Sequence, residues 1–367
     1  MTDIYDCCII GAGPAGLGCA VTAAGAGAKV VVVDEQPLPG GQLFKQIHKF
    51  FGSGTYRAGV RGYDIGKQLL EEAEELGVTV LLETPAWGIF PSEDGSGPIE
   101  TGVIHDRASR RIRSRRVLLA TGATERTLPF PGSTLPGVMT AGAAQTLMHI
   151  NRVRPGNRVV MVGSGNIGLI VTYQLLQAGV EVAAVVEEAG RVGGYAVHAN
   201  KIRTAGVPIL TGHTITRAEG ESMVEQVTLA RVDERREPVP GTERHVAVDA
   251  VCLAVGLLPR VELARLVTEK LHFDARLGGF IPVHSAKMEI GRGVYAAGDL
   301  TGIEEASKAQ EEGVLAGLAM AHSLGYLDES SAAALQRESE RRLALLRGGP
   351  LGDARRDAKR KLLEVWK

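Results

Sequence analysis

The sequence is poor in cysteine and in aromatic residues, and it has no strong charge of either sign. Its four cysteines are Cys7, Cys8, Cys19 and Cys252, and no two of them have a CxxC or other metal-ligand spacing. We therefore expect no disulfide and no metal site in this chain. Phe, Trp and Tyr make up 4% of the residues, and the net charge of −1 does not indicate nucleic acid as a partner.

Long hydrophobic runs are also missing. No apolar run reaches the roughly 18–20 residues that cross a bilayer, so we expect no membrane span. The start of the chain has Asp3 and Asp6 before an apolar run and lacks the basic region of a secretory signal peptide. A cytoplasmic location is the expectation. Glycine, in contrast, is abundant, with 47 residues, which is typical of proteins with glycine-rich nucleotide-binding loops.

The most informative feature is a glycine motif that occurs twice. Residues 9–18 read IIGAGPAGLG and residues 161–170 read MVGSGNIGLI, so each contains G-x-G-x-x-G after an apolar run. The helix that follows such a motif offers free backbone N–H groups and a positive dipole end to a pyrophosphate. The glycines permit a tight turn and close approach of the phosphates. Two such motifs predict two dinucleotide sites on one chain.

An acidic residue follows each glycine motif at the expected distance. Asp34 ends the run KVVVVD, 23 positions after Gly11, and Glu187 ends a second apolar run, 24 positions after Gly163. An acid at this place accepts hydrogen bonds from the ribose hydroxyls of an adenine dinucleotide. Because a carboxylate there repels a 2′-phosphate, Glu187 favours NAD(H) over NADP(H). Arg191, four residues further on, is a cation that would weaken this preference.

The order of these elements predicts an α/β protein with two intertwined domains. Each half contains a strand, a glycine turn, a helix and a second strand, and VLLATG (117–122) and VCLAVG (251–256) echo each other late in the two halves. We predict two Rossmann-like, three-layer dinucleotide-binding domains, the second inserted into the first. The first domain would comprise residues 1–125 and 257–327, and the second residues 126–256.

Residues 328–367 differ from the rest, because they are charged and helix-prone. We predict that they form a helical C-terminal tail. A basic cluster lies within it, made of Arg355, Arg356, Lys359, Arg360 and Lys361. Two interpretations stay open for this cluster: a solvated helical surface and a docking surface for a partner subunit.

These motifs, in this order, resemble those of the two-dinucleotide-binding-domain flavoproteins, over about 320 residues. The resemblance rests on GAGPAG with Asp34, GGQ, ATG, GSGNIG with Glu187, and GVYAAGD. It implies that the first motif holds FAD and the second a nicotinamide nucleotide. The implied FAD-binding residues are Gly11, Gly13, Pro14, Ala15, Gly16, Asp34, Glu35, Gln36, Gly41, Gln42, Ala120, Thr121, Gly122, Gly298, Asp299 and Ala306. The implied NAD-binding residues are Gly163, Gly165, Asn166, Ile167, Gly168, Glu187 and Gly256.

The chain departs from the disulfide reductases of this family, because their redox dithiol is missing. Residues 43–48, after the GGQ motif, contain no cysteine, and neither do residues 138–143, before the second glycine motif. A dithiol relay needs two thiols, so reduction of the thioredoxin, glutathione or lipoamide type is not expected. We interpret all four cysteines as core residues.

Longer phrases resemble a narrower group. Residues 34–42 (DEQPLPGGQ), 130–147 (FPGSTLPGVMTAGAAQTL) and 298–313 (GDLTGIEEASKAQEEG) are similar to alpha-type subunits of heteromeric opine, hydroxyproline and proline dehydrogenases, of the cyanide-forming glycine dehydrogenase, and of sarcosine oxidase. This resemblance implies a beta-type flavoprotein partner that oxidises the amino or imino acid. Many such alpha subunits carry a cysteine-rich iron–sulfur domain. No cysteine follows Cys252 here, so any iron–sulfur cluster would belong to a separate small subunit.

Hydride transfer between nicotinamide and flavin needs stacking and exclusion of water more than an acid–base pair. Lys45 follows the GGQ turn, and a cation near the flavin N1/C2 edge would stabilise the reduced anionic form; a purely structural role for Lys45 stays open. Glu304 and Glu305 are expected to stabilise a helix start through its dipole. The backbone N–H groups of Ala306 and Ser307 are further candidates to face the flavin.

The sequence therefore predicts an FAD-dependent oxidoreductase that passes electrons between flavin and NAD(H). We expect it to act as the alpha-type subunit of a heteromeric amino- or imino-acid dehydrogenase. One alternative is a self-sufficient NAD(P)H oxidoreductase with ferredoxin, a quinone or oxygen as acceptor. Another is a structural nucleotide-binding subunit without turnover of its own.

Overall fold

The computed structural model describes residues 4–50, 54–92, 97–349 and 352–366. The chain divides into two compact units, Met1–Thr124 with Leu258–Lys367 and Glu125–Leu257. It leaves the first unit at the short strand β7 (Ala123–Glu125) and returns at β16 (Leu257–Pro259). The second unit is therefore one continuous segment, and the first is made of two segments.

The first unit contains a mainly parallel sheet and a set of helices. Its strands are β1 (Tyr5–Ile10), β2 (Val30–Val33), β3 (Thr79–Leu81), β4 (Ala86–Phe90), β5 (Ile99–His105), β6 (Ala108–Leu119), β17 (Leu271–Asp274), β18 (Gly279–Pro282), β19 (Glu289–Gly291) and β20 (Val294–Ala296). Its helices are α1 (Pro14–Gly25), α2 (Gly62–Glu75), α6 (Ala306–Ser323), α7 (Glu329–Leu346) and α8 (Asp353–Trp366), with short 3-10 turns η1 (Gly41–Lys45) and η6 (Gly298–Thr301) among the connections. The sheet order is β19–β20–β6–β1–β2–β3, and β5 and β4 continue antiparallel from β6.

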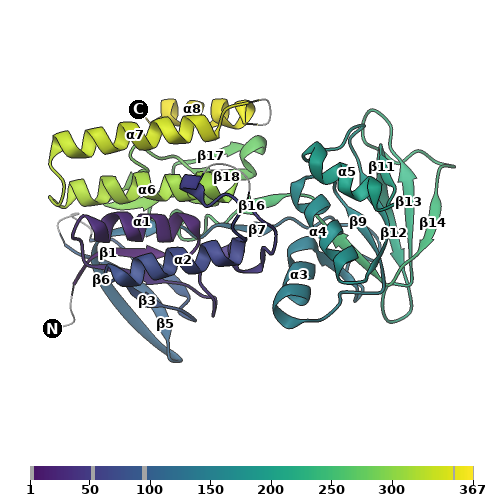
Figure 1. Cartoon of the computed structure of the whole chain (residues 1–367), viewed down its shortest axis with the longest axis horizontal. Helices are drawn as coiled ribbons and strands as arrows, with labels where there is room; N and C mark the ends of the chain where they lie inside the picture. The colour runs from purple at the N-terminus through teal and green to yellow at the C-terminus, as the bar shows by residue number, and fades with distance from the viewer. Residues whose placement is uncertain (1–3, 51–53, 93–96, 350–351, 367) are drawn as a thin grey trace. The chain divides into compact units, whose positions relative to one another are not determined.

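Alternate residues of β1 point to opposite faces of the sheet, and each face is covered by a different layer. Cys7 and Ile9 pack against α1 and α6, whereas Cys8 and Ile10 pack on the opposite face, against β4 and β5. A parallel strand that is covered on both faces has apolar residues on both faces, as Cys7–Ile10 of β1 and VVVV of β2 do. Figure 1 shows α1, α6 and α7 stacked in layers on the same side of β1.

Helices α1 and α6 approach closely because glycines line their contact. A Cβ added at Gly313 would lie 1.9 Å from the carbonyl oxygen of Ala15, and one at Gly18 would lie 2.7 Å from that of Gln310. Neither position accepts a side chain without a shift of backbone. The close contact carries the start of α6 to the start of α1, where Pro14, Ala306 and Gln310 line one small cavity.

The second unit repeats this plan with fewer strands. Its strands are β8 (Val138–Thr140), β9 (Arg158–Val162), β10 (Glu181–Glu187), β11 (Ile209–Thr211), β12 (His213–Glu219), β13 (Gln226–Arg231), β14 (Arg244–Ala247) and β15 (Ala250–Leu253). Its helices are α3 (Ala141–Thr146), α4 (Asn166–Gln177) and α5 (Ala196–Thr204). The parallel sheet has the order β11–β10–β9–β15–β8, with the helices on one face and the antiparallel β12–β13–β14 sheet on the other. The predicted fold class, two Rossmann-like three-layer units with a helical C-terminal tail, is confirmed.

The C-terminal residues form α7 and α8 and pack on the first unit. Leu343 of α7 belongs to the same hydrophobic core as residues of α1 and α6. Ala358 and Leu362 of α8 belong to a smaller core with Leu277. Lys359 is only 5% exposed. The predicted basic cluster is therefore not a single solvated surface, because the apolar residues beside Lys359 turn this face of α8 inward.

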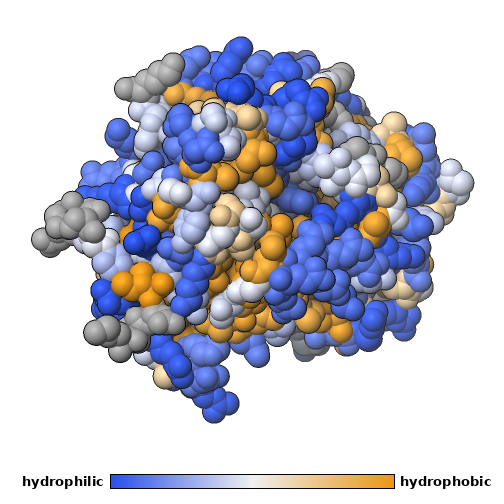
Figure 2. All heavy atoms as spheres, turned by 60° about the vertical axis from the view of Figure 1, so that its left-hand side comes forward, coloured by the Kyte–Doolittle hydropathy of each residue, from blue (hydrophilic) through white to orange (hydrophobic). Residues whose placement is uncertain are grey.

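The surface view in Figure 2 shows hydrophilic residues over much of the face turned to the viewer, with hydrophobic residues in separate patches. The longest helices, α6 and α7, have 18 residues each. Both carry several charged side chains. Within the described ranges, no helix combines the length and the apolar character that crossing a bilayer requires.

Candidate nucleotide-binding sites

Gly11 turns the chain from β1 into α1 in a way that only glycine permits. Its φ is +111°, and an added Cβ would lie 2.2 Å from the carbonyl oxygen of Ala120. A Cβ at Gly16 would lie 1.8 Å from the carbonyl oxygen of Gly11, so the helix rests directly on the turn. These two glycines are required by the local backbone.

Gly13 differs, because a side chain there would find space. Its φ of −77° and ψ of −177° suit any residue, and an added Cβ would approach only the Cα of Gly41, at 3.9 Å. Gly13 is the N-cap of α1, and no side chain caps the helix. The first backbone N–H groups of α1 thus border an open space beside Gly41, which suits an anion such as a pyrophosphate.

Asp34 closes this turn from the end of β2. Its Oδ2 accepts a hydrogen bond from the N–H of Ala12 (2.6 Å), and its Oδ1 accepts one from the N–H of Gln36 (2.8 Å). Burial raises the pKa of Asp34, and these two hydrogen bonds oppose the rise. The N–H of Gly40 donates to the carbonyl oxygen of Ala12 (2.7 Å). The structure therefore brings Asp34, the glycine motif and the GGQ turn together.

The ATG segment, residues 120–122, is connected through Arg260 to the end of β2. Arg260 directly follows β16. The N–H of Arg260 donates to the carbonyl oxygen of Gly122 (3.0 Å), and the Thr121 hydroxyl donates to that of Arg260 (2.9 Å). The Arg260 guanidinium donates to Glu35 (2.7 Å), and this hydrogen bond lowers the pKa of Glu35. Arg260 was not among the predicted site residues. Its only sequence signal is its position in residues 256–260 (GLLPR), where the chain returns to the first unit.

The GD motif reaches this place from the C-terminal half of the unit. Gly298 has a φ of +77°, and its added Cβ would lie 2.9 Å from the Cβ of Ala15, so η6 packs on the first turn of α1. Asp299 Oδ1 accepts a hydrogen bond from the N–H of Glu304 (3.1 Å). Burial raises the pKa of Asp299 to about 6.

Two further predicted positions lie close to this edge. Ala306 is the first residue of α6 and lines a small cavity with Pro14 and Ser307, so two helix N-termini meet there. Lys45 is the last residue of η1, three positions after Gln42, and is half-buried. A role of Lys45 toward a flavin stays a prediction.

The second glycine motif has the same geometry as the first. Gly163 has a φ of +104°, and its added Cβ would lie 2.3 Å from the carbonyl oxygen of Ala254. A Cβ at Gly168 would lie 2.1 Å from the carbonyl oxygen of Gly163. Gly165 is the N-cap of α4, and its added Cβ has no atom within 4 Å. Each glycine therefore repeats the role of its counterpart in the first unit.

Glu187 repeats the contacts of Asp34. Its Oε2 accepts hydrogen bonds from the N–H (2.9 Å) and the hydroxyl (2.6 Å) of Ser164, and its Oε1 accepts one from the N–H of Ala189 (2.9 Å). The N–H of Gly194 donates to the carbonyl oxygen of Ser164 (2.8 Å). The diglycine turn 193–194 thus lies against its motif as the turn 40–41 does. This repeat of the diglycine turn was not predicted, although each turn starts six residues after its acid.

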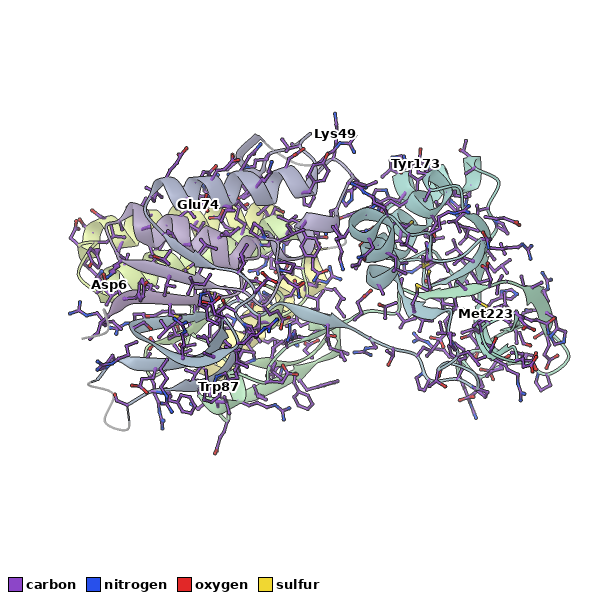
Figure 3. All side chains as sticks on the ribbon, turned by 90° about the horizontal axis from the view of Figure 1, so that it is seen from below. Asp6, Lys49, Glu74, Trp87, Tyr173 and Met223 are labelled. Atoms are coloured by element: carbon purple, nitrogen blue, oxygen red, sulfur yellow. The ribbon has the colours of Figure 1, made fainter. Side chains whose placement is uncertain are left out.

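The start of α4 is tied to the loop that follows β10. Asn166 Oδ1 accepts a hydrogen bond from the N–H of Tyr195 (2.8 Å), and Ile167 is 42% exposed in the first turn. Gly256, at the end of the unit, has a φ of +118° and accepts a hydrogen bond from the N–H of Arg126 (2.9 Å). Tyr173, labelled in Figure 3, lies on the exposed side of α4.

The four cysteines are all buried, as predicted. Burial raises the pKa of Cys7, Cys8 and Cys252 to about 12, so these thiols stay protonated and unreactive. In residues 138–143, where some disulfide reductases carry CxxC, the start of α3 instead meets a carboxylate. The N–H of Gly142 donates to Glu125 (2.7 Å).

A cavity of about 590 Å³ lies elsewhere on the first unit, lined by Arg115, Arg116 and Arg292 among others. Arg115 faces Asp6 at 3.6 Å, and Asp6 is labelled in Figure 3. None of the predicted site residues lines this cavity. Across the ranges that the structure describes, no three His, Cys, Asp or Glu side chains converge as metal ligands.

The sequence matches one protein family and is similar to several known proteins. Residues 5–313 match the family described as pyridine nucleotide-disulphide oxidoreductase. The chain is 30% identical over 370 residues to the A subunit of opine oxidase from Agrobacterium tumefaciens (strain Ach5), covering 96% of this chain and 73% of the relative. It is 29% identical to the alpha subunit of sarcosine oxidase from Corynebacterium sp. (strain U-96), covering 88% and 33%. It is 28% identical to the HcnB subunit of hydrogen cyanide synthase from Pseudomonas aeruginosa (strain PAO1), covering 85% and 70%.

Among solved structures, L-proline dehydrogenase from P. horikoshii superposes with a TM-score of 0.73 and 25% identity. The match covers 93% of this chain and 59% of that one, so this chain spans less than two thirds of that relative. Thioredoxin reductase from T. acidophilum superposes with a TM-score of 0.70 and 22% identity, covering 87% and 98%. The second likeness concerns the fold alone.

Proposed function

This chain belongs to the pyridine nucleotide-disulphide oxidoreductase family, and on that premise we propose that it exchanges electrons between FAD and NAD(H). The family and the relatives indicate an oxidoreductase, and the family implies binding of FAD and a nicotinamide nucleotide. One observation carries the proposal: both units place a glycine that the backbone does not require, Gly13 and Gly165, at an uncapped helix start.

The residues of the first unit fit an FAD. The open space beside Gly13 accommodates a pyrophosphate at the start of α1, and Asp34 and Glu35 lie at the end of β2, where the adenosine ribose binds in such folds. Asp299 would hold the ribityl chain. When bound, FAD supplies the two-electron redox chemistry. The residues of this chain bind it, orient it and exclude water.

The second unit supports NAD(H) rather than NADP(H). Glu187 is held at the end of β10 by Ser164 and Ala189 and presents a negative charge where a 2′-phosphate would lie. Arg191 is exposed nearby and is the residue that would oppose this preference. Specificity for NAD(H) is the expectation from this balance.

The names of the relatives support a partner for this chain. Three of them are named as subunits, one of opine oxidase, one of sarcosine oxidase and one of hydrogen cyanide synthase. We propose a beta-type flavoprotein partner that dehydrogenates the C–N bond of a small amino or imino acid. A small iron–sulfur subunit is a further candidate. A cytoplasmic location belongs to the same proposal.

An anaerobic titration of the FAD-loaded chain tests the proposal. NADH and then NADPH are added, and the visible absorbance of the flavin is followed. Bleaching by NADH in preference to NADPH is expected. Turnover with ferredoxin, a quinone or oxygen in the absence of any partner would favour the self-sufficient oxidoreductase. Bound FAD that responds to neither nucleotide would overturn electron exchange by this chain and favour a structural nucleotide-binding role.

A further inference from the structure

A buried glutamate lies directly behind the turn that carries Asp299. Glu312 of α6 is 2% exposed. Its Oε2 accepts a hydrogen bond from the N–H of Gly298 (2.9 Å) and lies 2.8 Å from the Thr301 hydroxyl, which donates to it. Gly298 and Thr301 are the first and last residues of η6. Glu312 therefore holds both ends of the short turn in which Asp299 lies.

The charge of Glu312 is balanced by two cations from the C-terminal helices. Lys359 of α8 and Arg347, the C-cap of α7, both contact its Oε1. The same cations meet Glu304, Arg347 at 2.5 Å and Lys359 at 3.3 Å. Burial raises the pKa of Glu312, but the charges of Lys359 and Arg347 outweigh burial and hold it well below its ordinary value. These four residues form an ion cluster with two charges of each sign.

The side chain of Lys359 runs beside Gly302 on its way to this ion cluster. Gly302 follows η6 with a φ of +128°, and an added Cβ would lie 3.2 Å from the Cε of Lys359 and 3.0 Å from the Cδ2 of Leu277. Ala358 and Leu362, which flank Lys359 on α8, pack in one core with Leu277. The position of the Lys359 ammonium is therefore set by the packing of α8 on the first unit.

Stability alone is a weak reason for such a cluster, since well-packed apolar residues often replace buried ion pairs without loss of stability. What an apolar replacement could not do is accept the hydrogen bonds of η6. We propose that the C-terminal helices position the flavin site: Lys359 and Arg347 orient Glu312, and Glu312 orients the turn that carries Asp299. This inference rests on the proposed FAD site. It makes Lys359 and Arg347 positioning residues.

The substitution Lys359→Met in the full chain tests this inference. It removes one cation and keeps the length of the side chain. We expect affinity for FAD to fall by about ten- to a hundredfold, as when the residues behind a ligand-binding group are removed, and the circular dichroism of the bound flavin to change. Lys359→Arg should keep most of the affinity. Lys361→Met, at an exposed position of the same helix, is the matched control and should change neither quantity.

The double variant Glu312→Gln with Lys359→Met separates positioning from stability. It leaves no unbalanced carboxylate at position 312, so its thermal midpoint should recover toward that of the wild type. Its affinity for FAD should stay low, because the new amide has lost Lys359 and keeps only Arg347 as a charged partner within the ion cluster. Recovery of both quantities together would show a merely structural role and overturn the inference, as would unchanged FAD affinity in a folded Lys359→Met chain. Wild-type chain that binds no FAD would instead refute the proposed function, and the inference with it.

Discussion

Gly13 and Gly165 hold the same place in the two units, and the surrounding fold requires neither. An added Cβ would meet only the Cα of Gly41 at 3.9 Å in the first case and nothing within 4 Å in the second. Their φ angles of −77° and −65° suit any residue. Gly11 and Gly163 have positive φ and no space for a side chain. The two open glycines therefore indicate room kept for a ligand.

The variants Gly13→Ala and Gly165→Ala should separate ligand binding from stability. We expect each to change the free energy of unfolding by no more than about 0.5 kcal/mol, because the methyl group enters open space. Gly13→Ala should weaken FAD binding at least about tenfold, since the methyl group stands where the pyrophosphate approaches the backbone. Gly165→Ala should leave FAD bound and weaken NADH binding. Calorimetric titration of each variant with FAD and with NADH measures the two affinities.

Gly25→Ala is the control for these variants, because it lies at the end of α1 with one neighbour at 4.0 Å. It should bind both nucleotides as the wild type does. Undiminished FAD affinity in Gly13→Ala would mean that the start of α1 is not a pyrophosphate site.

From the surroundings of His284 we expect a pH dependence of the stability of the first unit, with a sign that follows from its burial. The side chain is 4% exposed, its Nδ1–H donates to the carbonyl oxygen of Ser285 (2.9 Å), and its Nε2 finds no hydrogen-bond partner among the described residues. Burial lowers its pKa from 6.5 to about 4. The unfolded chain therefore binds more protons between these values, and stability is lost as pH falls from 6.5 toward 4.

The variant His284→Asn should remove this dependence, since Asn keeps a donor near Ser285 and does not titrate. The slope of unfolding free energy against pH between 6.5 and 4 should fall by up to about 1.4 kcal/mol per pH unit. Asp299 acts with opposite sign in part of this range, because its raised pKa makes the folded state bind more protons. Denaturant unfolding at several pH values measures the slope, and an unchanged slope would contradict the assignment to His284.

At the scale of elements, the contact between α1 and α6 places the GD turn and the glycine motif side by side. Three glycines on the two helices, Gly18, Gly313 and Gly317, meet backbone atoms of the partner helix within 2.9 Å of an added Cβ. The contact therefore depends on backbone approach more than on side-chain packing. Any residue that separates the helices also moves η6 away from the start of α1.

The variant Gly313→Ala tests this element. Its Cβ would lie 1.9 Å from the carbonyl oxygen of Ala15, so we expect a loss of about 1–3 kcal/mol in stability together with weaker retention of FAD. Thermal unfolding and flavin content after gel filtration are the measurements. Gly25→Ala again serves as control. A variant as stable as the wild type would mean that the two helices can separate without cost.

At the scale of the whole molecule, each unit has its own hydrophobic cores. The cores around β1 and β2 contain residues of the first unit alone, and those around β9 and β10 contain residues of the second unit alone. The second unit is also one continuous segment, Glu125–Leu257. It has the length and the independent core of an autonomous domain.

The isolated segment 125–257 should therefore fold by itself and bind NADH. We expect a cooperative thermal transition in circular dichroism and an affinity for NADH within about tenfold of that of the full chain. The same segment with Gly165→Ala should fold and bind NADH more weakly. A non-cooperative transition would mean that the second unit depends on the first for its stability.

The sequence by itself was sufficient for the strand, turn, helix and second strand that open each half, and for both glycine motifs. Gly11, Asp34, Gly163 and Glu187 could be predicted as site residues because a strand, a turn, a helix and an acid follow one another within a short stretch, and local sequence decides local backbone. The buried cysteines followed from their apolar neighbours. The helical character of residues 328–367 could likewise be predicted from the sequence. The side on which these helices pack could not.

Only the tertiary structure decided which distant charged residues meet near the first candidate site. Arg260 meets Glu35 across 225 positions of the chain, and Lys359 meets Glu312 across 47. Neither pair lies within a motif or a helical period. Glu35 was an implied FAD-binding residue, but Arg260, Glu312 and Lys359 read in the sequence as ordinary surface charges. Lys359 and Glu312 are buried in the structure, and a charge inside the protein requires a partner. The fold alone determines which partner is near. The tail, a run of charges in the sequence, is for that reason part of the first unit in the structure.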